Sequence, residues 1–220
     1  MATGLGTLCP QISLPADLYT ALSRFTVPLP PEPAAGSTIK VEPIRDKKAI
    51  HRIKKILGDW PRDLCLFTLG INTAYRANEL LSLKVGQVKN LKAGDVLDLK
   101  QRKTHKYRPV TLNATAVAAI QTWLQSSDLQ ADAYLFTGQR GCLTVETMST
   151  RVKTWCQEVG LKGNYGSHTL RKTWGDWQRL ERGTAIPLLM EAFGHATQQQ
   201  TLAYLGIQSN EIAAIYELEL

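Results

Sequence analysis

Apolar residues recur at helical spacing along most of the chain. Asp46 favours the N-cap position, and the helix expected after it carries Ile50, Ile53 and Ile56 on one face. Pro61 suits the first turn of a second helix, and a short helix is expected near residue 80. Further helices are predicted over residues 114–124, 145–159, 168–182, 186–193, 198–204 and 210–218.

Two segments alternate between apolar and polar residues with a period of two instead. They cover residues 96–99 and 107–112, and the basic stretch 100–106 separates them. This pattern predicts a β-hairpin with a cationic loop, and a further short strand is expected over residues 133–137. The predicted fold class is therefore α+β and mainly α-helical, a helical bundle with a small antiparallel sheet.

Prolines separate the first 40 residues from the rest. Pro28, Pro30, Pro31 and Pro33 precede an Ala-Ala-Gly-Ser stretch, and prolines this dense favour an extended linker. A segment of this length is too short for a second globular domain of ordinary size. We expect an N-terminal arm over residues 1–40 and one larger domain with a C-terminal helical tail over residues 41–220.

The charge is positive and unevenly distributed. The chain has 26 Lys and Arg against 19 Asp and Glu, and residues 40–108 alone hold 17 against 7. A basic body suits a polyanionic partner, which it binds through phosphate contacts and counterion release.

With no apolar run of about 18 residues and no secretory signal, we expect a cytoplasmic protein without a membrane span.

The cysteines do not form a metal or disulfide pattern. Cys9, Cys65, Cys142 and Cys156 include no Cys-x-x-Cys pair, and no histidine cluster lies near them. We therefore expect reduced thiols that are mostly buried, with no metal and no cofactor.

Two arginines and a tyrosine supply the main groups that metal-free phosphodiester exchange requires. The planar forks of Arg76 and Arg171 suit the nonbridging oxygens of a phosphate. Glu79 lies three residues after Arg76 on the same helical face and can orient it. Tyr204 offers a hydroxyl nucleophile if neighbouring cations stabilise the phenolate. Each residue, taken alone, is more often a surface cation or a core tyrosine.

Protons must also move in such a reaction. Lys103 lies in the cationic loop, where its ammonium group could protonate a leaving 5′-oxygen. His168 can exchange a proton with the nucleophile, and His195 can donate to a nonbridging oxygen. Lys106 and Arg108 are expected to contact backbone phosphates of DNA.

In this order and spacing, the motifs resemble those of the tyrosine recombinases, the phage-integrase type of site-specific recombinase. Arg76-Ala77-Asn78-Glu79-Leu80 resembles the family's Arg-x-x-Glu-Leu box, and His168-Thr169-Leu170-Arg171 its His-x-x-Arg box. Gly194-His195 with Tyr204 nine residues later is similar to the tyrosine box, and Lys103 to the hairpin lysine. The resemblance covers about residues 45–220.

The resemblance implies a mechanism and an assembly. The tyrosine attacks the DNA to leave a 3′-phosphotyrosine and a free 5′-hydroxyl, and a 5′-hydroxyl of the partner duplex reverses the step. Four protomers act on two double-stranded DNA segments through a Holliday junction, without a metal or a nucleotide. The tail over residues 210–218 docks on a neighbouring protomer or on its own body. Family members usually carry a larger N-terminal DNA-binding domain than the arm seen here.

Two alternatives stay open at this level. A type IB topoisomerase-like enzyme uses similar Arg, Lys, His and Tyr groups to relax supercoiled DNA. A non-catalytic DNA-binding regulator could retain the fold without the reaction, although the complete set of six residues speaks against it.

Overall fold

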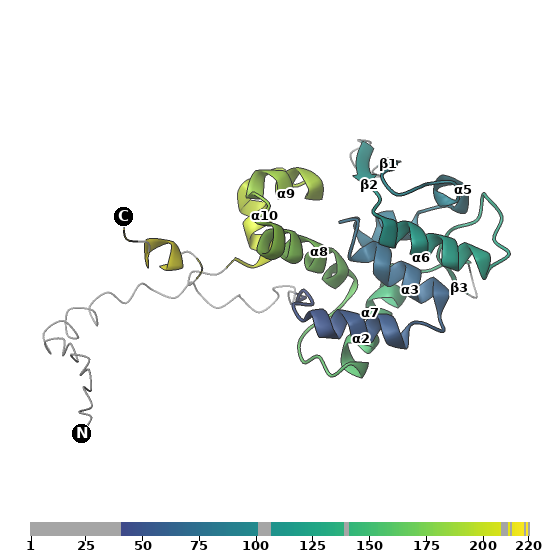
Figure 1. The fold of residues 1–220 in the computed structure, drawn as a ribbon, viewed down its shortest axis with the longest axis horizontal. Helices are drawn as coiled ribbons and strands as arrows, with labels where there is room; N and C mark the ends of the chain where they lie inside the picture. Colours follow the sequence, from purple (N-terminus) through teal and green to yellow (C-terminus); the bar gives the residue numbers. More distant parts are fainter. Residues whose placement is uncertain are drawn as a thin grey trace, which may run out of the picture. The chain divides into compact units, whose positions relative to one another are not determined.

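Helices dominate the structure, and a small antiparallel sheet accompanies them, as predicted (Figure 1). The computed structural model describes residues 41–100, 107–138, 141–207, 211, 213–217 and 219. They belong to one compact unit, Lys40–Leu220. The predicted arm over residues 1–40 lies outside the described residues, so it stays a prediction.

The first helices begin where the sequence predicts. The Asp46 side chain caps α2 (Lys47–Ile56) by accepting a hydrogen bond of 2.7 Å from the backbone N–H of Lys48. Helix α3 (Pro61–Gly70) begins at its proline, and α4 (Ala77–Leu81) is the short helix expected near residue 80. The single turn α5 (Val85–Val88) was not predicted, because four residues are too few to show a helical period.

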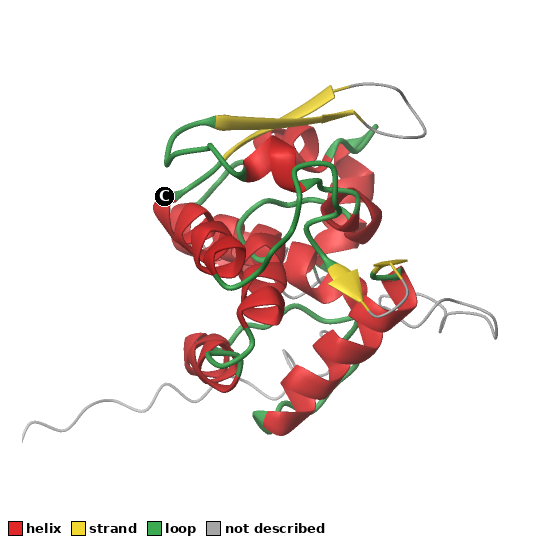
Figure 2. Cartoon of the chain, turned by 90° about the vertical axis from the view of Figure 1, so that its right-hand side faces the viewer, coloured by secondary structure: helices red, strands yellow, loops and turns green. Residues whose placement is uncertain are grey.

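The hairpin is confirmed. Strand β1 (Val96–Lys100) pairs antiparallel with β2 (Tyr107–Thr111), and Leu99 lies opposite Arg108. The two strands run along one edge of the helical body (Figure 2). Leu97 and Leu99 are buried, which explains the alternation in the sequence. The connecting residues 101–106 lie outside the described residues.

The predicted strand over residues 133–137 is mostly wrong. Tyr134 forms only an isolated bridge with Lys84. The actual strand β3 (Thr137–Gly138) is two residues long and pairs with β4 (Gly141–Cys142). Residues 135 and 136 are apolar because their side chains fill the helical core, and not because they extend a sheet.

The remaining helices agree with the prediction to within one or two residues. They are α6 (Ala114–Gln125), α7 (Val145–Glu158), α8 (Ser167–Arg182), α9 (Ile186–Phe193) and α10 (Gln198–Leu205). Helix α9 ends at Gly194, which adopts a left-handed conformation with φ of 60° and so turns the chain sharply.

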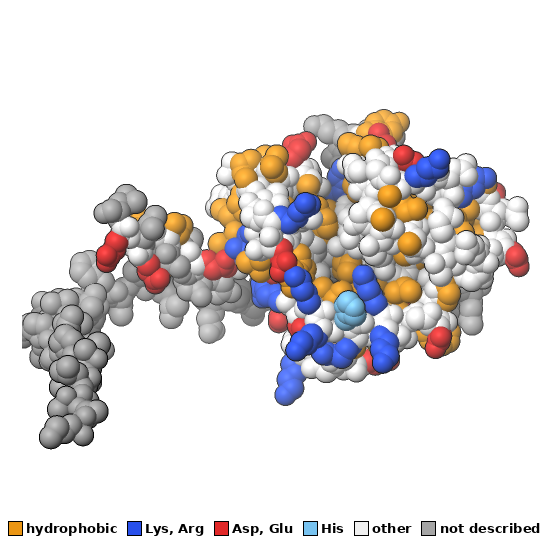
Figure 3. All heavy atoms as spheres, viewed as in Figure 1, with side chains coloured by type: hydrophobic (Ala, Val, Ile, Leu, Met, Phe, Trp, Pro, Cys, Tyr) orange, Lys and Arg blue, Asp and Glu red, His pale blue; other side chains and the backbone are white. Residues whose placement is uncertain are grey.

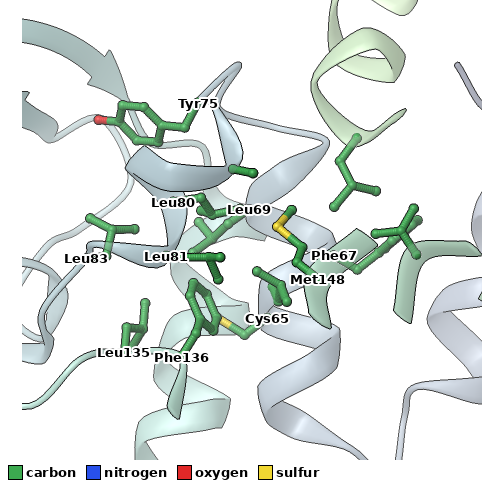
Figure 4. Close-up of a cluster of buried hydrophobic side chains, with 14 of the residues drawn as sticks. Cys65, Phe67, Leu69, Tyr75, Leu80, Leu81, Leu83, Leu135, Phe136 and Met148 are labelled. Atoms are coloured by element: carbon green, nitrogen blue, oxygen red, sulfur yellow. The ribbon is translucent and has the colours of Figure 1, made fainter. Parts of the chain in front are cut away.

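Two apolar clusters hold these helices together. The larger one joins α3, α4, α7 and the segment 135–136, and its closely packed side chains are shown in Figure 4. The smaller one contains Ala74, Leu189, Phe193 and Leu205, with Tyr204 packed against it. It joins α9 and α10 to the segment before α4, so residues distant in sequence meet there.

The segment before α2 is bound firmly to α8. The backbone N–H of Ile44 donates to Thr173 Oγ1 at 2.8 Å, and Trp177 Nε1 donates to the carbonyl of Ile44 at 2.9 Å. Arg45 pairs with the buried carboxylate of Asp176 at 3.1 Å.

Lys and Arg side chains gather on the surface over α2 (Figure 3).

The tail is helical in its described part. Residues 211 and 213 are helical, and Ala214–Glu217 form a 3-10 helix. Glu211 pairs with Arg179 of α8 at 2.6 Å, while Ile215 and Tyr216 are 68% and 85% exposed. The expected cap at Asn210 lies outside the described residues.

The thiols in the described part are free, as predicted. Cys65 and Cys156 are buried and Cys142 is partly buried, whereas Cys9 lies outside the described residues. Burial raises the pKa of the Cys156 thiol to about 12, which keeps it protonated. No helix in the described ranges is long and apolar enough to cross a membrane.

Candidate active site

Arg76 lies at the N-cap of α4, where Glu79 holds it from two sides. The Glu79 carboxylate accepts a hydrogen bond of 2.7 Å from the Arg76 backbone and one of 3.0 Å from its guanidinium. Nη2 of Arg76 donates to the carbonyls of Phe193 at 3.3 Å and Gly194 at 3.4 Å. The expectation that Glu79 orients Arg76 matches these contacts.

Arg171 is brought to the same place from α8. It is only 2% exposed, and its Nη2 donates to the Phe193 carbonyl at 2.6 Å. Arg76 and Arg171 therefore share one carbonyl oxygen, which places the two guanidinium groups next to each other. Burial lowers the Arg171 pKa to about 10, so this group remains charged at neutral pH.

Ala74 supplies the second acceptor of Arg171. It adopts φ of 55°, a left-handed conformation that costs a non-glycine residue about 1–2 kcal/mol. Its carbonyl accepts hydrogen bonds from both Arg171 and Arg108. Two charged donors on one carbonyl stabilise this backbone turn and offset its strain.

The two histidines both lie next to Tyr204. His168 Nδ1 is 3.5 Å from the Tyr204 hydroxyl, and the His195 ring centroid is 5.2 Å from the Tyr204 ring. Burial, together with Arg171 and other nearby cations, lowers the His168 pKa. The same causes lower the His195 pKa to about 4. Both imidazoles are therefore neutral at pH 7.

His195 is fixed by its neighbours. Its ring stacks on Phe193, with centroids 5.1 Å apart, and its Nδ1 lies 3.0 Å from the hydroxyl of the buried Thr201. Thr201 was not found by sequence reasoning, because a threonine in a helix carries no signal of its own.

The hydroxyl of Tyr204 is not ionised in this environment. Burial raises its pKa, and the charges of Arg171, Arg76 and Arg108 oppose the rise without cancelling it. The cations expected to favour the phenolate are therefore present, but burial outweighs their effect on the Tyr204 pKa.

The other predicted residues are either buried or outside the described part of the chain. Lys103 and Lys106 belong to the segment 101–106, which is not described. Arg108 is only 6% exposed and pairs with Glu79 at 2.8 Å, although it was expected to contact a DNA phosphate. Its basic neighbours in the sequence favoured that contact, whereas its position in β2 turns the side chain inward.

A groove in the described part of the chain lies elsewhere. It has a volume of about 570 Å³ and is lined by Trp174 and Trp177 of α8 and by Thr111 of β2, among others. None of the candidate catalytic residues in the described part lines it. These described residues also include no group of three His, Cys, Asp or Glu side chains that could hold a metal ion.

Comparison with known proteins places this site in a family. The model of the phage integrase family matches residues 46–211, a range that includes Arg76, Arg171 and Tyr204. The chain belongs to the phage integrase family. Two arginines, two histidines and a tyrosine thus converge within the part of the chain that is common to the family.

Relatives of this integrase family member are recombinases. The probable integrase/recombinase YoeC of Bacillus subtilis is 29% identical over 181 residues, which cover 81% of this chain and 96% of YoeC. Tyrosine recombinase XerC of Haemophilus ducreyi is 26% identical over 162 residues, or 71% of this chain and 51% of XerC. The chain thus spans nearly all of YoeC and about half of XerC.

A solved recombinase structure shares the fold. The XerH site-specific recombinase, in a post-cleavage complex with palindromic difH substrate, superimposes with a TM-score of 0.64 at 25% identity. The match covers 83% of this chain and 55% of XerH. The mainly helical fold with a small sheet is therefore that of a tyrosine recombinase catalytic domain.

Proposed function

We propose that this protein is a site-specific DNA recombinase or integrase that cleaves and rejoins double-stranded DNA through a 3′-phosphotyrosine. The observation that carries the proposal is the meeting of Arg76 and Arg171 on the carbonyl of Phe193, beside the Tyr204 ring. The similarity to XerH, whose structure is a post-cleavage complex with its substrate, supports it.

The arginines clamp the scissile phosphate. Negative charge grows on the nonbridging oxygens in the transition state, and guanidinium groups already held in place stabilise it without reorganisation. The backbone carbonyls of Phe193 and Ala74 accept hydrogen bonds from the Arg171 guanidinium, so its remaining N–H groups are oriented in advance. Losing one such donor costs about 3–4 kcal/mol, or roughly a hundredfold to a thousandfold in rate.

Tyr204 is the nucleophile, and His168 accepts its proton. The lowered pKa of His168 keeps this imidazole neutral and able to accept at pH 7. The Tyr204 oxygen attacks phosphorus and the bond from phosphorus to the 5′-oxygen breaks. Lys103 gives its proton to that leaving oxygen, and His195 donates a hydrogen bond to a nonbridging oxygen. A 5′-hydroxyl reverses the reaction, so neither a metal nor a cofactor is needed.

The full reaction requires an assembly. Four protomers on two DNA duplexes are proposed, with the C-terminal tail of each docked on its neighbour. The exposed Ile215 and Tyr216 support this, because apolar side chains on a tail gain free energy when a partner covers them.

A covalent adduct tests the proposal. A nicked suicide duplex from DNA that flanks the gene is incubated with the wild type and with Tyr204→Phe in EDTA. We expect a protein–DNA adduct on a denaturing gel with the wild type only. No adduct on a duplex that the protein demonstrably binds would instead support a non-catalytic DNA-binding regulator.

A second assay separates recombination from relaxation. Exchange of strands between two duplexes that carry the site supports the recombinase. Relaxation of supercoiled plasmid by the monomer, without exchange, would support a topoisomerase-like enzyme.

A further inference from the structure

We propose that Arg108 is a positioning residue that holds both clamping arginines and ties strand β2 to them. The inference rests on the proposed function, because it assigns Arg108 a part in the same phosphate clamp. It replaces the phosphate contact expected for this residue.

The first link runs through Glu79. One oxygen of this carboxylate pairs with Arg76 at 3.0 Å and the other with Arg108 at 2.8 Å. The side chains of Arg108 and Glu79 are only 7% and 12% exposed, so their pair lies away from bulk water, where charge-assisted bonds are strong. The Arg76 side chain is 38% exposed, so its pair with Glu79 is closer to solvent. Arg108 therefore fixes the carboxylate that in turn fixes Arg76.

The second link runs through Ala74. Nη2 of Arg108 donates to the Ala74 carbonyl at 2.9 Å, and the same oxygen accepts from Arg171. The left-handed turn at Ala74 directs this carbonyl between the two side chains. Arg108 thus contacts one partner of each clamping arginine, although it contacts neither guanidinium directly in the interactions described.

Arg108 faces the interior. Its guanidinium carbon lies 4.9 Å from the centre of the Tyr75 ring, and Nε and Nη1 are buried without a hydrogen-bond partner among the described residues. The Tyr75 hydroxyl donates to the carbonyl of Leu97 in β1 at 2.8 Å. The Tyr75 ring and the Arg108 guanidinium together join the hairpin to the segment before α4. A residue that only contacts phosphate would not need this packing.

The position of Arg108 in β2 links the hairpin to the clamping arginines. It is five residues after Lys103, and it lies opposite the buried Leu99 in the strand register. The strand that follows the lysine segment is therefore attached to the carboxylate that orients Arg76. One side chain thus attaches strand β2 to the proposed phosphate clamp.

The first experiment needs no DNA. Nitrogen-15 NMR spectra would record the Nε–Hε signals of Arg76 and Arg171 in the wild type, Arg108→Lys and Arg108→Gln. We expect both signals to shift in Arg108→Gln and to be partly restored in Arg108→Lys. Unchanged signals in a folded Arg108→Gln would overturn the proposal.

The chain offers a matched control. Arg62 pairs with the buried Asp63 at 2.8 Å and donates to the carbonyl of Thr137 at 2.7 Å, so it repeats the carboxylate-and-carbonyl pattern away from the site. Arg62→Gln should lower the melting temperature without moving the signals of Arg76 and Arg171. If it moves them as much as Arg108→Gln does, the effect is general and the proposal fails.

The second experiment separates positioning from phosphate contact. Binding to a random-sequence duplex of about 30 base pairs is measured over a range of salt concentrations. A lost phosphate contact lowers the slope of log affinity against log salt by about one. We expect an unchanged slope for Arg108→Gln, and a slope lowered by one would show that Arg108 binds phosphate directly.

The third experiment measures the chemical step. On the suicide duplex, Arg108→Gln should slow adduct formation by about a hundredfold, the cost of a displacement of about 1 Å in a clamp. The defect should shrink on a methylphosphonate, whose methyl group replaces one nonbridging oxygen and removes the charge to be clamped. An equal defect on both substrates would contradict the proposal. If the wild type forms no adduct, the proposed function fails, while the NMR signals still decide whether Arg108 positions the arginines.

Discussion

Backbone carbonyl oxygens organise the charged side chains of this site. The Phe193 oxygen gathers Arg76 and Arg171, and the Ala74 oxygen gathers Arg171 and Arg108. Carbonyls carry no net charge, so they hold the Arg171 guanidinium without neutralising it, whereas the Glu79 carboxylate pairs with Arg76 and Arg108. The positive charge of Arg171 remains available for a phosphate, which is the condition for strong stabilisation of the transition state.

At the residue level, we expect Thr201 to select the tautomer of His195. Its hydroxyl is 3.0 Å from His195 Nδ1, and if it donates there, Nε2 carries the proton that a phosphate oxygen can accept. Thr201→Val keeps the shape and removes the donor, so adduct formation should fall about tenfold. Nitrogen-15 NMR of the imidazole would show the tautomer change. Thr201→Ser should behave as the wild type, and an unaltered tautomer in Thr201→Val would refute this role.

The lowered pKa of His195 predicts a dependence of stability on pH. The unfolded chain binds a proton at its ordinary pKa of 6.5, whereas the folded protein binds it only near pH 4. Because the unfolded state then holds more protons, the free energy of unfolding should decrease as pH falls from about 6.5 to 4. Urea denaturation at several pH values measures this. His195→Gln should flatten the decrease, and an equally steep decrease in that variant would assign it to other groups.

At the level of elements, α8 serves two surfaces at once. His168 and Arg171 of this helix face the site, while Thr173 and Asp176 bind the segment 44–45 that precedes α2. Their spacing along the helix places the two sets on different sides of its axis. A shift of α8 would therefore change both the contacts of the segment 44–45 and the proposed phosphate clamp.

Gly175 allows α9 and α10 to approach α8 closely. A Cβ atom at this position would overlap the Phe193 ring and lie 3.0 Å from Leu205. Gly175→Ala should therefore displace Phe193, whose carbonyl holds both arginines, and lower stability by about 1–3 kcal/mol. Thermal melting and adduct formation well below the melting temperature would test this. Normal adduct formation by the folded variant would show that the position of Phe193 is not critical.

The elements that sequence patterns missed are those that packing creates. The turn α5 and the strands β3 and β4 are two to four residues long, too short for periodicity to mark them. The apolar run near residue 135, which predicted a strand, arises because Leu135 and Phe136 insert into the core. Capped helices such as α2 were predictable, because the cap and the apolar period are both local.

At the level of the whole molecule, variants of the C-terminal tail can show whether it docks on a neighbouring protomer or on its own chain. Ile215 and Tyr216 are exposed in the single chain, so Ile215→Asp and Tyr216→Asp should change the free energy of unfolding by less than about 0.5 kcal/mol. We expect both variants to bind one site normally and to form fewer higher-order complexes on native gels. A clear loss of monomer stability would indicate that the tail packs on its own chain.

Caps, periodicity and the spacing within each motif are properties of nearby residues, so the helices, the hairpin and the resemblance to the family follow from the sequence alone. Three features depend on the packing of the chain instead: the Phe193 and Ala74 carbonyls gather the arginines, Arg108 is buried, and burial raises the Tyr204 pKa. Burial and the direction of a carbonyl depend on how segments about a hundred residues apart pack together, and no local pattern encodes that packing.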